Sequence, residues 1–157
     1  MNAYSKIQSC RVGGSTHLVS VLDLGIHALS GVFPKRAEEP VTEGPLALVW
    51  CPDSCLLQLS HSYDASEMYG ENYGYRSGLN QSMVNHLTDK ISCLERLVPL
   101  RAGDVVVDIG SNDATTLKAY RTAGIRRIGI DPTGRKFARY YTDDIALIPD
   151  FFSADAY

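Results

Sequence analysis

One stretch constrains the fold most: an apolar run that ends near an acidic residue and turns through a glycine. Residues 105–109 read Val-Val-Val-Asp-Ile, and Gly110 follows before a segment that opens as a helix. A second apolar run, at 128–130, ends on Asp131. Strand, glycine turn, helix, second strand and an acid about 20 residues after the turn are the parts of a doubly wound nucleotide-binding sheet. The sequence therefore predicts an α/β domain that binds its ligand at the carboxyl ends of these strands.

The loop after the first strand indicates the kind of ligand. Residues 110–114 contain one glycine, whereas a pyrophosphate-binding fingerprint needs three, so an NAD-dependent enzyme is disfavoured. Oxygen acceptors in the loop repel phosphate and suit a cationic nucleoside with amino and hydroxyl groups, which predicts a methyl-donor site for S-adenosylmethionine. The predicted site comprises Asp108, Gly110, Asn112, Asp113, Asp131 and Pro132. The alternative is that both strand-end acids only cap strands and that Gly110 is only a turn glycine.

Residues 1–62 read as a separate small β unit. Short apolar segments at 18–24, 45–50 and 56–59 predict three strands, and cysteines stand at 10, 51 and 55. Two cysteine turns joined by short strands are typical of a zinc ribbon, in which the metal replaces a core too small to hold itself. The sequence thus predicts a zinc-ribbon-like domain.

A loop and an α/β segment follow this unit. Residues 63–80 are rich in tyrosine and glycine, which predicts an active-site loop with aromatic and hydroxyl groups over a cleft. From 81 to 157, apolar residues at helical spacing predict a helix over 82–97. Strands are predicted at 105–109 and 128–131, with a third at 145–148.

Motifs along almost the whole chain resemble the sugar C-methyltransferases, which act on nucleotide-linked deoxy-ketosugars. They are the segments at 10–15, 21–25, 69–78, 107–113 and 129–133. The resemblance implies a zinc-binding domain followed by a Rossmann-like class I methyltransferase domain, of which this chain resembles the amino-terminal and central part only. It also implies substrate contacts by Tyr73 and Tyr75, and donor contacts by Arg76 and Ser77. The chain reads as a truncated or split enzyme, to which a second chain could supply the missing part.

The chain departs from the family pattern at both cysteine turns and in the donor loop. Gly13 stands where the family has a cysteine, and Ser54 occupies another ligand position, with Cys55 at the glycine position that follows. Two alternatives stay open: a weakened zinc site on Cys10, Cys51 and Cys55, or a metal-free relic. His17 and His27 are the nearest candidates for a further ligand, without supporting spacing. Ala114 replaces a family glycine, where a positive φ angle would strain an alanine.

Composition excludes several classes of protein. The 157 residues are 45% hydrophobic and 21% charged with a net charge of -3, and no aromatic ladder accompanies the basic residues, so a nucleic-acid partner is not expected. No apolar stretch is long enough for a membrane span or a secretion signal, which favours a cytoplasmic protein. Two functions remain: methyl transfer to a sugar nucleotide, or non-catalytic binding of a nucleoside, a metal or a partner protein.

Overall fold

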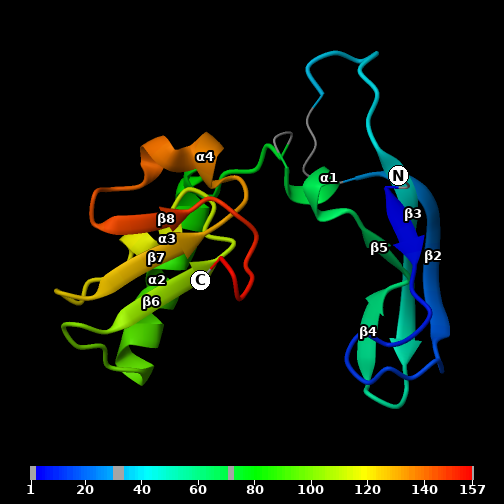
Figure 1. Cartoon of the computed structure of the whole chain (residues 1–157), viewed down its shortest axis with the longest axis horizontal. Coiled ribbons are helices and arrows are strands. Elements are labelled where there is room, and N and C mark those ends of the chain that lie inside the picture. The colour runs from blue at the N-terminus through cyan, green and yellow to red at the C-terminus, as the bar shows by residue number, and fades with distance from the viewer. Residues whose placement is uncertain (1–2, 30–33, 71–72, 157) are drawn as a thin grey trace. The chain divides into compact units, whose positions relative to one another are not determined.

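Two compact units make up the chain in a computed structural model, which describes residues 3–29, 34–70 and 73–156 (Figure 1). The first unit spans Met1–Gly74 and the second spans Tyr75–Tyr157. The boundary lies inside the predicted loop 63–80, so Tyr73 and Tyr75 belong to different units. Residues 71–72 of that loop lie outside the described residues.

An antiparallel sheet of three strands forms most of the first unit. It contains β2 (Val19–Ala28), β3 (Glu43–Cys51) and β4 (Leu56–Leu59), in the order β2-β3-β4. All three predicted strands are confirmed, although β2 runs further than 18–24. It does so with two register shifts against β3, and Gly25 (φ 78°) lies within the second irregular stretch.

A second, two-stranded sheet in the first unit was not foreseen from the sequence. β1 (Tyr4–Lys6) pairs antiparallel with β5 (His61–Tyr63). Helix α1 (Ala65–Tyr69) then starts at Asp64, whose side chain accepts a hydrogen bond from the Ser66 amide. This N-cap stabilises a helix of five residues. The glycine content had predicted that the whole of 63–80 is loop.

A parallel sheet with helices forms the second unit. The strands β6 (Val105–Ile109), β7 (Arg126–Ile130) and β8 (Ile145–Ile148) pair in that order. Helix α2 (Gln81–Leu97) precedes the sheet, and its predicted amphipathic stripe buries Ile91. The strands and this helix confirm the predicted elements. The remaining helical turns are η1 (Ser77–Leu79), α3 (Thr115–Lys118), α4 (Gly134–Phe137) and η2 (Ala138–Tyr140).

The core of the second unit lies beside the first turn of α3. Ala114, Leu117 and Ile145 form a buried cluster, against which Val106 and Tyr141 pack. This small core fixes the turn between β6 and α3, which carries the predicted donor loop. The structure is thus a mixed α/β chain with small sheets. In the part of the chain that is described, no helix combines the length and apolar character needed to cross a membrane.

Candidate functional site

The turn between β6 and α3 has the backbone that the sequence indicated. Gly110 has a φ of 77°, and its amide donates to the carbonyl oxygen of Ile130 at 2.8 Å, which ties the turn to β7. Ala114 has a φ of 61°, so the strain considered for an alanine at this family glycine position applies. A left-handed conformation costs a non-glycine residue roughly 1–2 kcal/mol. Ala114 is fully buried, and its methyl group packs in the core in partial compensation.

Asp108 stands near the end of β6 without a hydrogen-bond donor to its carboxylate among the described residues. Its side chain is half-buried, and it pairs in register with Gly129 of β7. Burial, and then the negative charge of Asp131, raise the pKa of Asp108 above its ordinary value, while Lys90 acts in the opposite direction. The fold therefore keeps a partly desolvated acceptor at this strand end.

Asp131 follows β7 and organises the two turns at this edge of the sheet. One carboxylate oxygen accepts from the Asn112 amide at 2.8 Å, and the other accepts from the amide and hydroxyl of Thr133. The residue is almost fully buried, and Pro132 continues the turn half-buried. The sequence predicted Asp131 as a ligand acceptor, whereas the described contacts of its carboxylate are structural.

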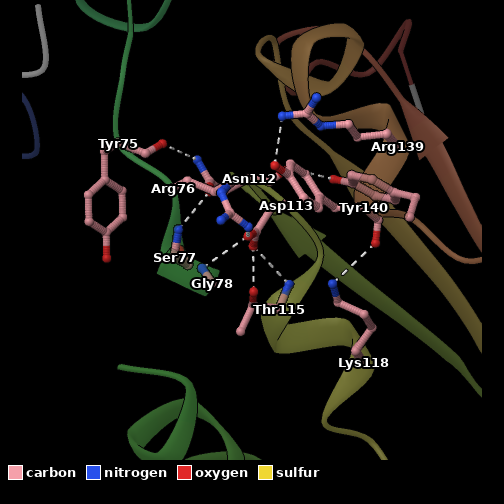
Figure 2. A network of polar contacts seen from close by, with 11 residues as sticks. Tyr75, Arg76, Ser77, Gly78, Asn112, Asp113, Thr115, Lys118, Arg139 and Tyr140 are labelled. Carbon is pink, nitrogen blue, oxygen red and sulfur yellow. Dashed lines mark hydrogen bonds and ion pairs between the residues drawn. The ribbon is translucent and has the colours of Figure 1, made fainter. Parts of the chain in front are cut away.

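Asn112 and Asp113 hold the segment that precedes α2 (Figure 2). The Ser77 amide donates to Asn112 Oδ1 at 3.0 Å, and the Gly78 amide donates to Asp113 Oδ2 at 3.0 Å. Asn112 Nδ2 also donates to the carbonyl of Tyr75 at 3.1 Å. The sequence treated both side chains as ligand acceptors. In the structure they satisfy backbone groups of an irregular segment, which otherwise has few internal partners.

Arg76 completes this network. Its guanidinium forms an ion pair with the buried Asp113 at 3.2 Å and stacks on the Tyr140 ring, 4.2 Å from the ring centre. Arg139 approaches the same ring at 4.9 Å, so two cations flank one tyrosine (Figure 2). Sequence reasoning missed Tyr140, because a single tyrosine in a helical turn carries no spacing signal.

A cavity of about 280 Å³ adjoins the network. Its lining includes the paired Arg76 and Asp113 together with Lys118 and Arg121. Lys118 is oriented by a hydrogen bond from Nζ to the Tyr140 carbonyl at 3.1 Å. Three cations against one paired carboxylate give this cavity a positive character, which suits an anionic group.

The two tyrosines predicted to contact substrate lie on either side of the unit boundary. Tyr73 is half-buried, and its ring packs edge-to-face on Tyr69 with centroids 5.7 Å apart. Tyr75 is 43% exposed. The Tyr73 phenol therefore belongs to the first unit and the Tyr75 phenol to the second.

The cysteines predicted to bind metal separate into a buried pair and an exposed residue. Cys10 and Cys51 are buried, and Cys10 Sγ lies 3.1 Å from the Ser54 hydroxyl oxygen. Hydrogen bonds from the Gly13 backbone, and next from Ser54, lower the pKa of the Cys10 thiol to about 6. Cys55 is exposed at a φ of 56°, with its thiol 3.7 Å from the Pro52 carbonyl. The predicted three-thiolate set is therefore not assembled: within the described ranges, no three Cys, His, Asp or Glu side chains gather to hold a metal ion.

The predicted further metal ligands also have other partners. His17 Nδ1 lies 3.9 Å from an Asp53 carboxylate oxygen, and His27 Nε2 lies 2.8 Å from the Leu24 carbonyl oxygen. Both histidines are exposed. Neither joins the buried cysteine pair.

Comparison with known proteins shows what the chain is similar to. Residues 10–69 match a family model described as "Putative zinc binding domain". The chain is 31% identical over 153 residues to the C-methyltransferase NovU of Streptomyces niveus, a match that covers 95% of this chain and 36% of that protein. The chain thus spans about a third of the length of this curated relative. These matches confirm the resemblance that the motifs indicated, to the amino-terminal region of the sugar C-methyltransferase family.

Proposed function

We propose that the chain forms the donor-binding part of an S-adenosylmethionine-dependent C-methyltransferase, and that its second unit is the start of a Rossmann-like class I domain. The parallel order β6-β7-β8 supports this proposal, with a glycine turn after the first strand and an acid after the second. The similarity to a C-methyltransferase over 95% of this chain supports the reaction class that we propose.

The observation that carries the proposal is the state of Asp108. A half-buried carboxylate without a described hydrogen-bond donor lowers stability, because burial penalises its charged form. Its position near a strand end, beside the positive-φ turn at Gly110, is where doubly wound sheets bind nucleosides. A donor amino or ribose hydroxyl group would supply the missing hydrogen bond. The proposal therefore explains why an acid that weakens the fold stands at this position.

The remaining donor contacts are assigned by chemistry. Gly110 would let the backbone approach the nucleoside, and Asp131 with Pro132 would shape the edge of the site. The carboxylate of the amino-acid end suits the positive cavity at Arg76, with Ser77 beside it. When bound, S-adenosylmethionine supplies a methyl carbon activated by the neighbouring sulfonium.

Calorimetric titration of the chain with S-adenosylmethionine tests the donor site. We expect micromolar binding, about -7 to -8 kcal/mol. Asp108→Asn should weaken it about tenfold or more, because a hydrogen bond to a charged group contributes about 1.5–3 kcal/mol. Asp143→Asn, at an exposed position after η2, is the matched control and should bind as the wild type does. Absence of binding at millimolar ligand, or equal affinity for both variants, would refute the assignment.

For the acceptor, we propose a nucleotide-linked deoxy-ketosugar, with Tyr75 of the second unit on its side of the site. The phenol could stack on the sugar or donate a hydrogen bond to the ketone and its enolate. Transfer of labelled methyl from the donor to such a ketosugar is the measurement. Tyr75→Phe removes one hydroxyl and should reduce transfer without changing donor affinity.

A second candidate function is donor or nucleoside binding without transfer. It is favoured by Ala114, whose left-handed φ of 61° lies in the donor loop at the position where the resembling family has a glycine. Under this alternative the calorimetric result is unchanged and no labelled product forms with any nucleotide-linked ketosugar. The two assays together therefore separate the candidates.

A further inference from the structure

Two turns of the first unit bring residues 10 and 13 of the first turn close to residues 51 and 54 of the second. Cys10 Sγ lies 3.1 Å from Ser54 Oγ, and the buried Cys51 side chain contributes to the lowered pKa of the Cys10 thiol. The Gly13 amide lies 3.5 Å from Cys10 Sγ, and a Cβ built on Gly13 would lie 3.5 Å from Ser54 Cβ. The spacings 10–13 and 51–54 are those of two zinc-binding turns. The geometry of a four-ligand site is therefore present, at a set of positions that excludes Cys55.

The side chains at these positions do not suit zinc. Structural zinc sites use four cysteine or histidine ligands around the ion, sometimes with a carboxylate. Here the set offers two thiols, one serine hydroxyl and, at Gly13, no side chain. His17, the nearest histidine by sequence, lies beside Asp53 at 3.9 Å. Two metal ligands are missing from the place where the geometry would require them.

Other interactions join the same two turns. Within the first turn, the Cys10 amide donates to the Ser15 carbonyl at 2.8 Å, and the Gly14 amide donates to the Cys10 carbonyl at 2.9 Å. Between the turns, Ser54 bonds to Cys10, while Cys10 and Cys51 are 2% and 0% exposed. The thiols are therefore shielded from water like small core side chains.

Arg11 adds a link that a metal site would not need. Its guanidinium donates to the carbonyls of Leu59 (2.9 Å) and His61 (3.1 Å), and to the Ser62 hydroxyl at 3.0 Å. It also contacts the side-chain oxygen of Gln58 at 3.2 Å. One side chain of the first turn thus fastens to the strands that follow the second turn.

We propose that the first unit folds without a metal ion, that the buried contact of Cys10, Cys51 and Ser54 together with Arg11 joins its two turns, and that cysteines at Gly13 and Ser54 would create a zinc site. The inference stands independently of the donor site, which lies in the second unit. It assigns the loss of metal to two particular positions.

Metal content and stability of the whole chain test the first part. Trp50 is the chain's single tryptophan and lies next to Cys51 in β3, so its fluorescence in urea follows the first unit. After expression with added zinc, we expect less than about a tenth of an equivalent of bound zinc and a Trp50 midpoint that EDTA does not change. Thiol titration of the denatured chain should count all four cysteines as free. About one equivalent of zinc whose removal lowers the midpoint, or a count of two thiols, would overturn the proposal.

Two double variants test the second part. Gly13→Cys/Ser54→Cys should bind about one equivalent of zinc and acquire a Trp50 midpoint that rises with zinc and falls with EDTA. Val12→Cys/Asp53→Cys adds the same number of thiols at exposed neighbouring positions and should remain near the wild-type zinc content. Equal zinc content in the two variants would show that the four positions do not face one point. Should the first variant fail to fold even with zinc, the wild-type measurements decide the proposal.

Discussion

Asp113 is the residue at which a single substitution should affect the second unit most. Its side chain is 1% exposed and accepts four hydrogen bonds. Oδ2 accepts from Gly78 and Arg76, at 3.0 and 3.2 Å, and Oδ1 accepts from the amide and hydroxyl of Thr115. Asp113→Asn keeps the shape of the side chain but leaves one acceptor oxygen and removes the charge opposite Arg76.

The cost follows from the donors that lose their acceptor. In either orientation the amide NH2 faces two donors, and each buried donor left unsatisfied costs about 1–3 kcal/mol. Breaking a fully buried ion pair costs about 3–5 kcal/mol. Arg76 is 19% exposed and retains its stacking on Tyr140, which lets water and the ring compensate in part. We therefore expect the low end, about 3 kcal/mol.

Urea unfolding followed by two signals measures this loss and localises it. Far-ultraviolet circular dichroism follows chiefly α2 in the second unit, and Trp50 fluorescence follows the first unit. With an m-value of about 1–1.5 kcal/mol/M, the dichroism midpoint should fall by about 2–3 M. The fluorescence midpoint should not move, and Asp143→Asn should change neither. A shift of less than about 0.5 kcal/mol, within the range of ordinary surface substitutions, would refute this account of the network.

Two further predictions concern the sheet of the second unit. Burial and the charge of Asp131 raise the pKa of Asp108 in the folded chain, so the folded state holds this proton more tightly than the unfolded state, and stability falls as pH rises from the acidic range to neutrality. Asp108→Asn removes that loss, so its dichroism midpoint in urea should exceed the wild-type midpoint near pH 7. The two midpoints should become similar near pH 3, below the ordinary aspartate pKa of about 3.9. An equal or lower midpoint of the variant at neutral pH would contradict this. Gly129→Ala would place a Cβ 2.5 Å from Ser111 Oγ and 2.9 Å from a ring carbon of Tyr141, so we expect a loss of about 1–3 kcal/mol in the same assay, and a midpoint equal to wild type would show that the site has room.

The elements with a strong local pattern were the ones that could be predicted. The apolar runs that became β6 and β7 pair in a parallel sheet, and the stripe of α2 has the helical period, so each pattern predicts its own element. Such features depend on residues close in sequence.

The features that were missed depend on distant partners. β1 pairs with a strand more than fifty residues later, and three residues carry too little periodicity to indicate it. Asp113 is of a residue type that suits a ligand, but its type does not reveal that Arg76 and Gly78 lie beside it. Similarly, Cys55 was favoured over Ser54 as a member of the cysteine cluster because a thiol is the usual ligand, whereas the turn geometry directs the serine inward.

The hydrogen bonds from Ser77 and Gly78 to the loop after β6 give the second unit a built-in reporter. Both amide protons are held by side chains of the very turn at which a nucleoside would bind, instead of by a regular helix or strand. A ligand that tightens this turn would slow the exchange of these two amides with deuterated solvent, and a ligand that pulls Asn112 or Asp113 away would speed it. Occupancy can thus be observed on the backbone without a chromophore or a turnover assay.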